Sequence, residues 1–101
     1  IRIISMSTTE NLSDVVVSRA EQYESLDNSL ELPEPLAVEY RVQRDKSINE
    51  IVLTMTYGGP TVKLYLRKGT IKGDWAGEDL SVSVRNEPLL TELWDYYESL
   101  F

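Results

Sequence analysis

Residues 50–75 constrain the fold of this chain most strongly. They read EIVLTMTYGGPTVKLYLRKGTIKGDW, in which three stretches of alternating apolar and polar residues are separated by two short turns that contain glycine. Alternation of this kind gives a β-strand one apolar face, and glycine supplies the backbone conformations that tight hairpins need. The stretch therefore predicts three antiparallel strands joined by hairpins.

Two further alternating stretches extend the predicted sheet. Residues 36–43 precede the central stretch, and residues 80–84 (LSVSV) follow it. Because all connections between the five strands are short, we expect an antiparallel meander. The residues predicted to face the core are Leu36, Val38, Tyr40, Val42, Ile51, Leu53, Met55, Tyr57, Val62, Leu64, Leu66, Ile71, Gly73 and Trp75.

Helices are predicted before the first strand and after the last one. Apolar residues recur at helical spacing over residues 8–26, after a Ser7–Glu10 segment that fits a capping box. At the other end Asn86 is predicted to cap a C-terminal helix, with Glu87 and Pro88 in its first turn. The apolar stripe of that helix comprises Leu90, Leu93, Trp94, Tyr97, Leu100 and Phe101.

The predicted fold class is α+β, in which a five-stranded antiparallel meander sheet carries an N-terminal and a C-terminal helix packed on one face. A chain of 101 residues has the length of a single domain, residues 1–101. Residues 1–6 are expected to derive from upstream or vector sequence, or to form a short edge strand. The proline-containing residues 27–35 are predicted to be a linker.

Composition excludes several enzyme classes. The chain has no cysteine and no histidine, which removes Ser-His, Cys-His and zinc-thiolate chemistry. We therefore predict a non-enzymatic protein without catalytic residues, metal or cofactor. No apolar run approaches the ~18 residues of a membrane span, so the expected location is the cytoplasm and no membrane partner is expected.

Three local features have a functional and a structural interpretation. Residues 58–60 (GGP) could approach a phosphate, but a phosphate loop runs into a helix and this one runs into a strand. Asp74, Glu78 and Asp79 lack the tight alternation of a calcium loop. Trp75 and Trp94 fall on apolar faces. The structural interpretations, namely a hairpin turn, a solvated acidic loop and core tryptophans, are favoured.

Charge is distributed unevenly along the chain. The net charge is −7, yet residues 36–75 carry seven basic and four acidic residues, whereas the two flanking helical segments are acidic. An acidic helix face can bind a basic partner, and a basic sheet face with a tyrosine can bind single-stranded nucleic acid. An ordinary solvated face is the alternative for each surface. The candidate acidic residues are Glu87, Glu92, Asp95 and Glu98; the candidate basic-face residues are Arg41, Lys63, Tyr65, Arg67 and Lys72.

Residues 38–101 resemble a group of small, uncharacterised proteins encoded by bacteriophages and prophages. The resemblance lies in residues 57–60 (YGGP), residues 73–77 (GDWAG) and the acidic, aromatic C-terminal helix ending WDYYESLF. It implies a phage or mobile-element origin and assigns no activity to any residue.

Three functions are consistent with these features. The first is an interaction protein that binds a host protein through the acidic helical surface, with a nucleic-acid-handling protein as one candidate partner. Inhibitors of host defence such as anti-CRISPR proteins are often small and acidic in this way. The second is a nucleic-acid-binding module that uses the basic sheet face. The third is a self-associating subunit, a homodimer joined through the sheet edge or the open face.

Overall fold

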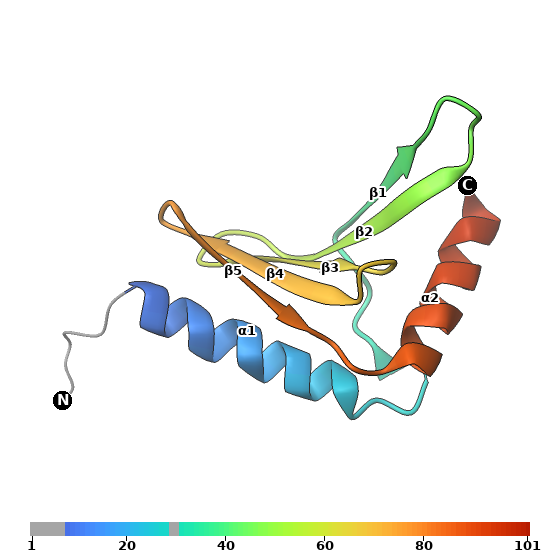
Figure 1. The fold of residues 1–101 in the computed structure, drawn as a ribbon. Coiled ribbons are helices and arrows are strands. Elements are labelled where there is room, and N and C mark those ends of the chain that lie inside the picture. Colours follow the sequence, from blue (N-terminus) through green and yellow to red (C-terminus); the bar gives the residue numbers. More distant parts are fainter. Residues whose placement is uncertain (1–7, 29–30) are drawn as a thin grey trace, which may run out of the picture.

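The computed structural model describes residues 8–28 and 31–101 (Figure 1). The predicted capping residue Ser7 and the edge strand considered for residues 1–6 lie outside the described residues. The elements, in chain order, are α1 (Thr8–Glu24), β1 (Ala37–Val42), β2 (Ile48–Thr56), β3 (Thr61–Tyr65), β4 (Thr70–Trp75), β5 (Glu78–Ser83) and α2 (Glu87–Leu100).

The five strands form one antiparallel sheet in the order β1-β2-β3-β4-β5, which confirms the predicted meander. The turn between β2 and β3 contains Gly58 and Gly59 at φ values of 63° and 27°, a region that L-residues with a side chain rarely occupy. The peptide bond between Gly59 and Pro60 is cis. Trp75 lies half-buried beside this turn, with its indole 3.6 Å from the position of a Cβ at Gly59.

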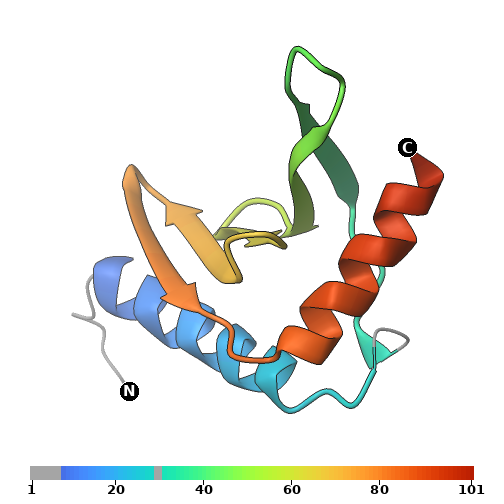
Figure 2. The same cartoon turned by 45° about the vertical axis from the view of Figure 1, so that its right-hand side comes forward.

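Both helices pack on the apolar face of the sheet, at different places. Helix α1 lies against β4 and β5, and α2 lies near β2, so that the two helices share one core. Figure 2 shows the helices diverging from a common corner where α2 begins. Side chains from the sheet and from both helices meet in this core, including Leu12, Val16, Tyr23, Ile51, Leu53, Val62, Leu64, Ile71 and Leu89.

Gly73 sets how closely α1 approaches the sheet. A Cβ at this position would lie 2.4 Å from Cγ2 of Val16 and 2.9 Å from Cδ1 of Leu12, both fully buried on α1. The absence of a side chain on β4 therefore creates the groove into which α1 fits. This contact compensates the low helix propensity of the β-branched run around Val16.

The β1–β2 hairpin differs from the sequence prediction. Of the four side chains expected to face the core, Leu36 is 61% exposed, Val42 43% and Val38 36%, and only Tyr40 is half-buried. Figures 1 and 2 show why: the hairpin extends past both helices, so no second layer covers most of its apolar side. Tyr57, also expected inside, follows the end of β2 and is 62% exposed.

Strand β2 is buried on both faces. Val52 and Thr54 belong to the face predicted to be open, yet they are only 1% and 6% exposed. Their neighbours in the sheet explain this, because Val52 lies between Glu39 of β1 and Tyr65 of β3. The longer side chains of these neighbours can cover a small residue on the central strand.

Substituting Gly73→Ala tests the fit of α1 against the sheet. The added methyl group would overlap Val16 and Leu12, so we expect the free energy of unfolding in urea to fall by about 1–3 kcal/mol. Lys72→Ala is the matched control, because Lys72 belongs to the opposite face of the same strand, and it should change stability by less than about 0.5 kcal/mol. Equal effects of the two substitutions would contradict the proposed contact.

Candidate functional site

Helix α2 begins at the predicted cap. The side-chain oxygen of Asn86 accepts a hydrogen bond from the backbone N–H of Leu89 (3.2 Å), and proline occupies the first turn. Leu89, Leu90 and Leu93 are buried against the sheet and α1, although Leu89 was not in the predicted stripe. These contacts fix which side of α2 faces outward.

Asn86 also binds the end of α1. Its amide nitrogen donates to the backbone carbonyls of Tyr23 and Leu26, each at 3.0 Å, and lies 3.3 Å from that of Glu24. The neighbouring backbone N–H of Arg85 donates to the Glu24 carboxylate at 2.8 Å. One asparagine therefore satisfies groups at the C-terminus of α1 and at the N-terminus of α2, which positions the two helices relative to each other.

The four predicted acidic residues of α2 all lie on its exposed side. At 100° per residue, Glu87, Glu92, Asp95 and Glu98 fall within one broad arc that excludes the buried leucines. Residues 87–100 contain no lysine or arginine, so every charge that the helix itself contributes is negative. We call these four residues the acidic face of α2.

Exposed apolar residues adjoin the acidic face at the C-terminal end of α2. Tyr96 is 55% exposed, Leu100 60% and Phe101 62%. The Phe101 ring contacts Tyr40 of β1, with ring centroids 4.8 Å apart, and the Tyr40 hydroxyl donates to the Tyr97 carbonyl at 2.6 Å. This end of α2 is therefore joined to the β1–β2 hairpin while much of its apolar surface stays accessible.

The environment of this junction raises the pKa of two tyrosine hydroxyls. Burial, and after it the nearby Tyr96, raises the pKa of the Tyr40 hydroxyl above its ordinary value. Burial is also the main cause of the raised pKa of Tyr97. Both shifts favour the protonated form that a phenol already has at neutral pH, and the Tyr40 proton is the one donated to the Tyr97 carbonyl.

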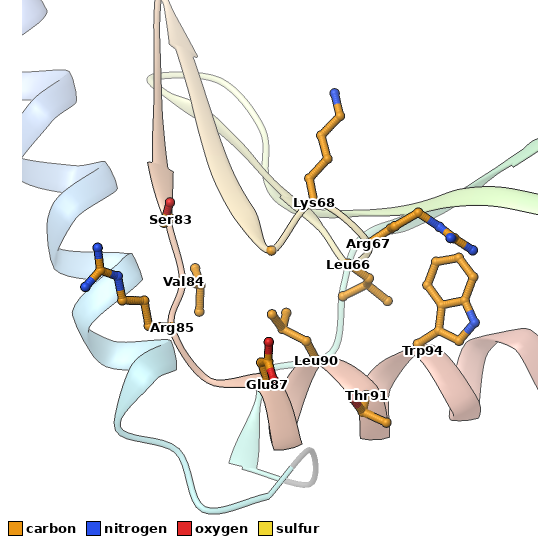
Figure 3. A pocket seen from close by; sticks show the side chains of 11 residues that line it. Leu66, Arg67, Lys68, Ser83, Val84, Arg85, Glu87, Leu90, Thr91 and Trp94 are labelled. Carbon is orange, nitrogen blue, oxygen red and sulfur yellow. The ribbon is translucent and has the colours of Figure 1, made fainter.

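A groove of about 820 Å³ lies between α2 and the turn after β3 (Figure 3). Leu66, Val84 and Leu90 form its apolar floor. Figure 3 shows Lys68 and Arg85 extending away from the floor, whereas Glu87 lies beside Leu90. The groove therefore combines an apolar floor with polar and charged lining residues.

The opposite face of the sheet holds a second hollow, of about 490 Å³. Tyr65 lines this hollow. The guanidinium carbon of Arg41 lies 5.4 Å and the Lys68 ammonium 5.3 Å from the centroid of its ring. The same hollow is lined by Thr70, Lys72 and Ser81, and Lys63 is the cross-strand neighbour of Lys72. We call Arg41, Lys63, Tyr65, Lys68 and Lys72 the basic sheet face.

Arg67 does not belong to this face, contrary to the sequence prediction. Its guanidinium lies 4.8 Å from the Trp94 ring of α2 and donates to the Ile48 carbonyl at 3.3 Å. Trp94 is half-buried next to the core, as predicted. Lys68, which the sequence places in a turn, takes the expected place of Arg67 beside Tyr65.

The buried carboxylate of Glu50 holds the backbone of the turn that carries Arg67 and Lys68. One carboxylate oxygen accepts from the backbone N–H groups of Ile51 (2.9 Å) and Arg67 (2.7 Å), and the other accepts from that of Lys68 (3.1 Å). Glu50 is only 4% exposed. The carboxylate therefore fixes the turn that directs Arg67 toward α2 and Lys68 toward the sheet face, a role that no local sequence signal indicates.

No protein-family model, curated protein or solved structure matches the chain. Among the described residues, no group of three acidic side chains has the proximity that a metal ion needs. Nor does any described helix combine the length and apolarity needed to cross a membrane. The acidic face of α2 and the basic sheet face are the two candidate functional surfaces of the described residues.

Substituting Glu50→Gln tests the role of the buried carboxylate. In the variant an NH₂ group replaces one of the two carboxylate oxygens of Glu50. At least one backbone N–H that donates to this oxygen in the parent protein therefore loses its acceptor. We expect the free energy of unfolding in urea to fall by about 1–3 kcal/mol. Asp79→Asn, at an exposed position, should change it by less than about 0.5 kcal/mol. An E50Q variant as stable as the parent protein would rule out this role.

Proposed function

We propose that this protein is a non-enzymatic interaction protein whose acidic face of α2 binds a basic surface on a partner protein. The observation that carries the proposal is the arrangement of Glu87, Glu92, Asp95 and Glu98 on one exposed side of a helix that has no basic residue. Such a face attracts basic surfaces, including those with which proteins bind nucleic acid. Inhibition of a host nucleic-acid-handling protein, as by anti-CRISPR proteins, is the corresponding biological role.

The exposed residues at the end of α2 support this proposal. Protein interfaces commonly combine an apolar, aromatic centre with a charged rim. Tyr96, Leu100 and Phe101 supply exposed apolar surface directly beside Asp95 and Glu98. Charge would steer the partner toward α2, and burial of the aromatic side chains would then slow its dissociation.

Charge reversal on α2 tests the proposal. The tagged parent protein and its E92K/D95K/E98K variant are used to capture proteins from the same host lysate, and captured proteins are quantified by mass spectrometry. We expect the variant to recover the specific partner at least ~10-fold less well, because like charges across an interface cost several kcal/mol.

The matched control is the D14K/E21K/D79K variant, which changes the net charge equally at exposed positions outside α2. It should capture the partner as the parent does. Loss of the partner from both variants would indicate a general charge effect, and retention by the E92K/D95K/E98K variant would exclude the acidic face of α2.

A second candidate function is binding of single-stranded nucleic acid by the basic sheet face. The specific observation in its favour is the hollow in which Arg41, Lys68 and Lys72 converge around Tyr65. Cations can neutralise backbone phosphates there, and the tyrosine ring can stack on a base. Asp74 and Asp79 are cross-strand partners at the end of β4 and the start of β5. Their negative charges limit the basic surface to the length of a short oligonucleotide.

Fluorescence anisotropy tests this second function. A fluorescein-labelled uridine strand of about eight nucleotides should bind in ~50 mM salt and dissociate as salt rises. The K68E/K72E variant should bind at least ~10-fold more weakly. The R44E/K46E variant makes the same charge change in the β1–β2 turn, at two residues that do not line the hollow, and should bind normally. Absence of binding by the parent protein at low salt would refute this function.

A further inference from the structure

Strand β1 forms an edge of the described sheet and carries exposed apolar side chains. Its neighbour on one side is β2, and the sheet order places no described strand on the other. Val38 and Val42 are 36% and 43% exposed. Alternation along the strand places them on the side that also carries Tyr40. An edge strand presents a row of backbone N–H and C=O groups to any strand that can align with it.

The sequence of β1 is symmetric about Tyr40 in its chemistry. Glu39 and Arg41 flank the tyrosine with opposite charges, and Val38 and Val42 flank these with equal apolar side chains. Antiparallel pairing of two such strands about Tyr40 places Glu39 opposite Arg41 of the second copy, and Val38 opposite Val42. The ion pair and the apolar pair each form twice, because the arrangement has two-fold symmetry.

We propose that β1 pairs antiparallel with β1 of a second copy of this chain, about a two-fold axis at Tyr40. The two five-stranded sheets then become one continuous sheet. The charges favour this arrangement over parallel pairing in the same register, in which Glu39 would face Glu39 and Arg41 would face Arg41. Like charges directly opposite each other destabilise strand pairs.

The charges of β1 are already arranged for this pairing. Within one chain Nε of Arg41 lies 3.0 Å from a Glu39 carboxylate oxygen, on the side of β1 opposite Tyr40. Pairing of two copies would join two such ion pairs into a network of four alternating charges. Each exposed pair contributes little alone, so the charges chiefly set register, while backbone hydrogen bonds and valine contacts supply attraction.

The end of α2 adds to the same interface. Phe101 contacts Tyr40 and is 62% exposed. In the proposed dimer Tyr40 lies at the two-fold axis, so each Phe101 would lie near β1 of the other copy. The other edge strand of the sheet, β5, lacks these features. Its charged residues, Glu78 and Asp79, are both acidic, and α1 packs against it.

Sedimentation equilibrium over a concentration series tests the proposal. The parent protein should form a dimer with a Kd in the micromolar range, since one strand edge and its flanking side chains make a small interface. The single variants E39R and R41E place like charges opposite each other in both pairs. Each should weaken dimerisation at least ~10-fold while circular dichroism shows an unchanged fold.

Mixing the two variants provides the decisive result. In a heterodimer of E39R with R41E, two arginines of one strand face two glutamates of the other, so dimerisation should return to the level of the parent protein. A role of these residues in the folding of a single chain cannot produce this rescue. The D79R variant, altered on the β5 edge, is the control and should dimerise normally.

Three outcomes would overturn the proposal. The first is a parent protein that remains monomeric up to ~1 mM, the weak limit of specific association. The second is a mixture of E39R and R41E that dimerises no better than either variant alone. The third is loss of the dimer in D79R with retention in E39R, which would assign the interface to β5.

Discussion

The hydrogen bonds of Asn86 hold the arrangement of the two helices, on which the exposed surfaces of this protein depend. Its side-chain NH₂ group donates to backbone carbonyls at the end of α1, and its side-chain oxygen accepts from the backbone N–H of Leu89 in the first turn of α2. Backbone groups at helix ends have no partner within the helix, so one side chain that satisfies both ends stabilises both and sets the angle between them. With that angle set, Leu89 and Leu93 are buried, and the acids of α2 turn outward.

The sheet separates surfaces of opposite charge. On one side lie the helices and the acidic face of α2; on the other lies the hollow around Tyr65 with its cations. Glu50 maintains this separation at the turn after β3, where successive residues Arg67 and Lys68 diverge to the two sides. A protein with a net charge of −7 therefore has a local basic surface, and this surface is the proposed nucleic-acid-binding site of the second candidate function.

Periodicity and turn chemistry were sufficient to predict the order of elements, the meander and the cap of α2, because these depend on neighbours in sequence. The exposure of β1 was not predictable, since alternation shows which side of a strand is apolar but not whether a helix reaches it. The position of Arg67 was predicted wrongly because β3 ends at Tyr65, where strand alternation stops. Its true position depends on Glu50, a contact distant in sequence.

Site-specific photo-crosslinking measures most directly whether α2 is the partner-binding surface. A photoreactive amino acid is introduced at Asp95 in one variant and at Lys72 in another, and both are irradiated with host lysate. The proposed function predicts a crosslinked partner from position 95, and no crosslink to that partner from position 72. Crosslinking of the partner from position 72 alone would contradict the account and assign recognition to the basic sheet face.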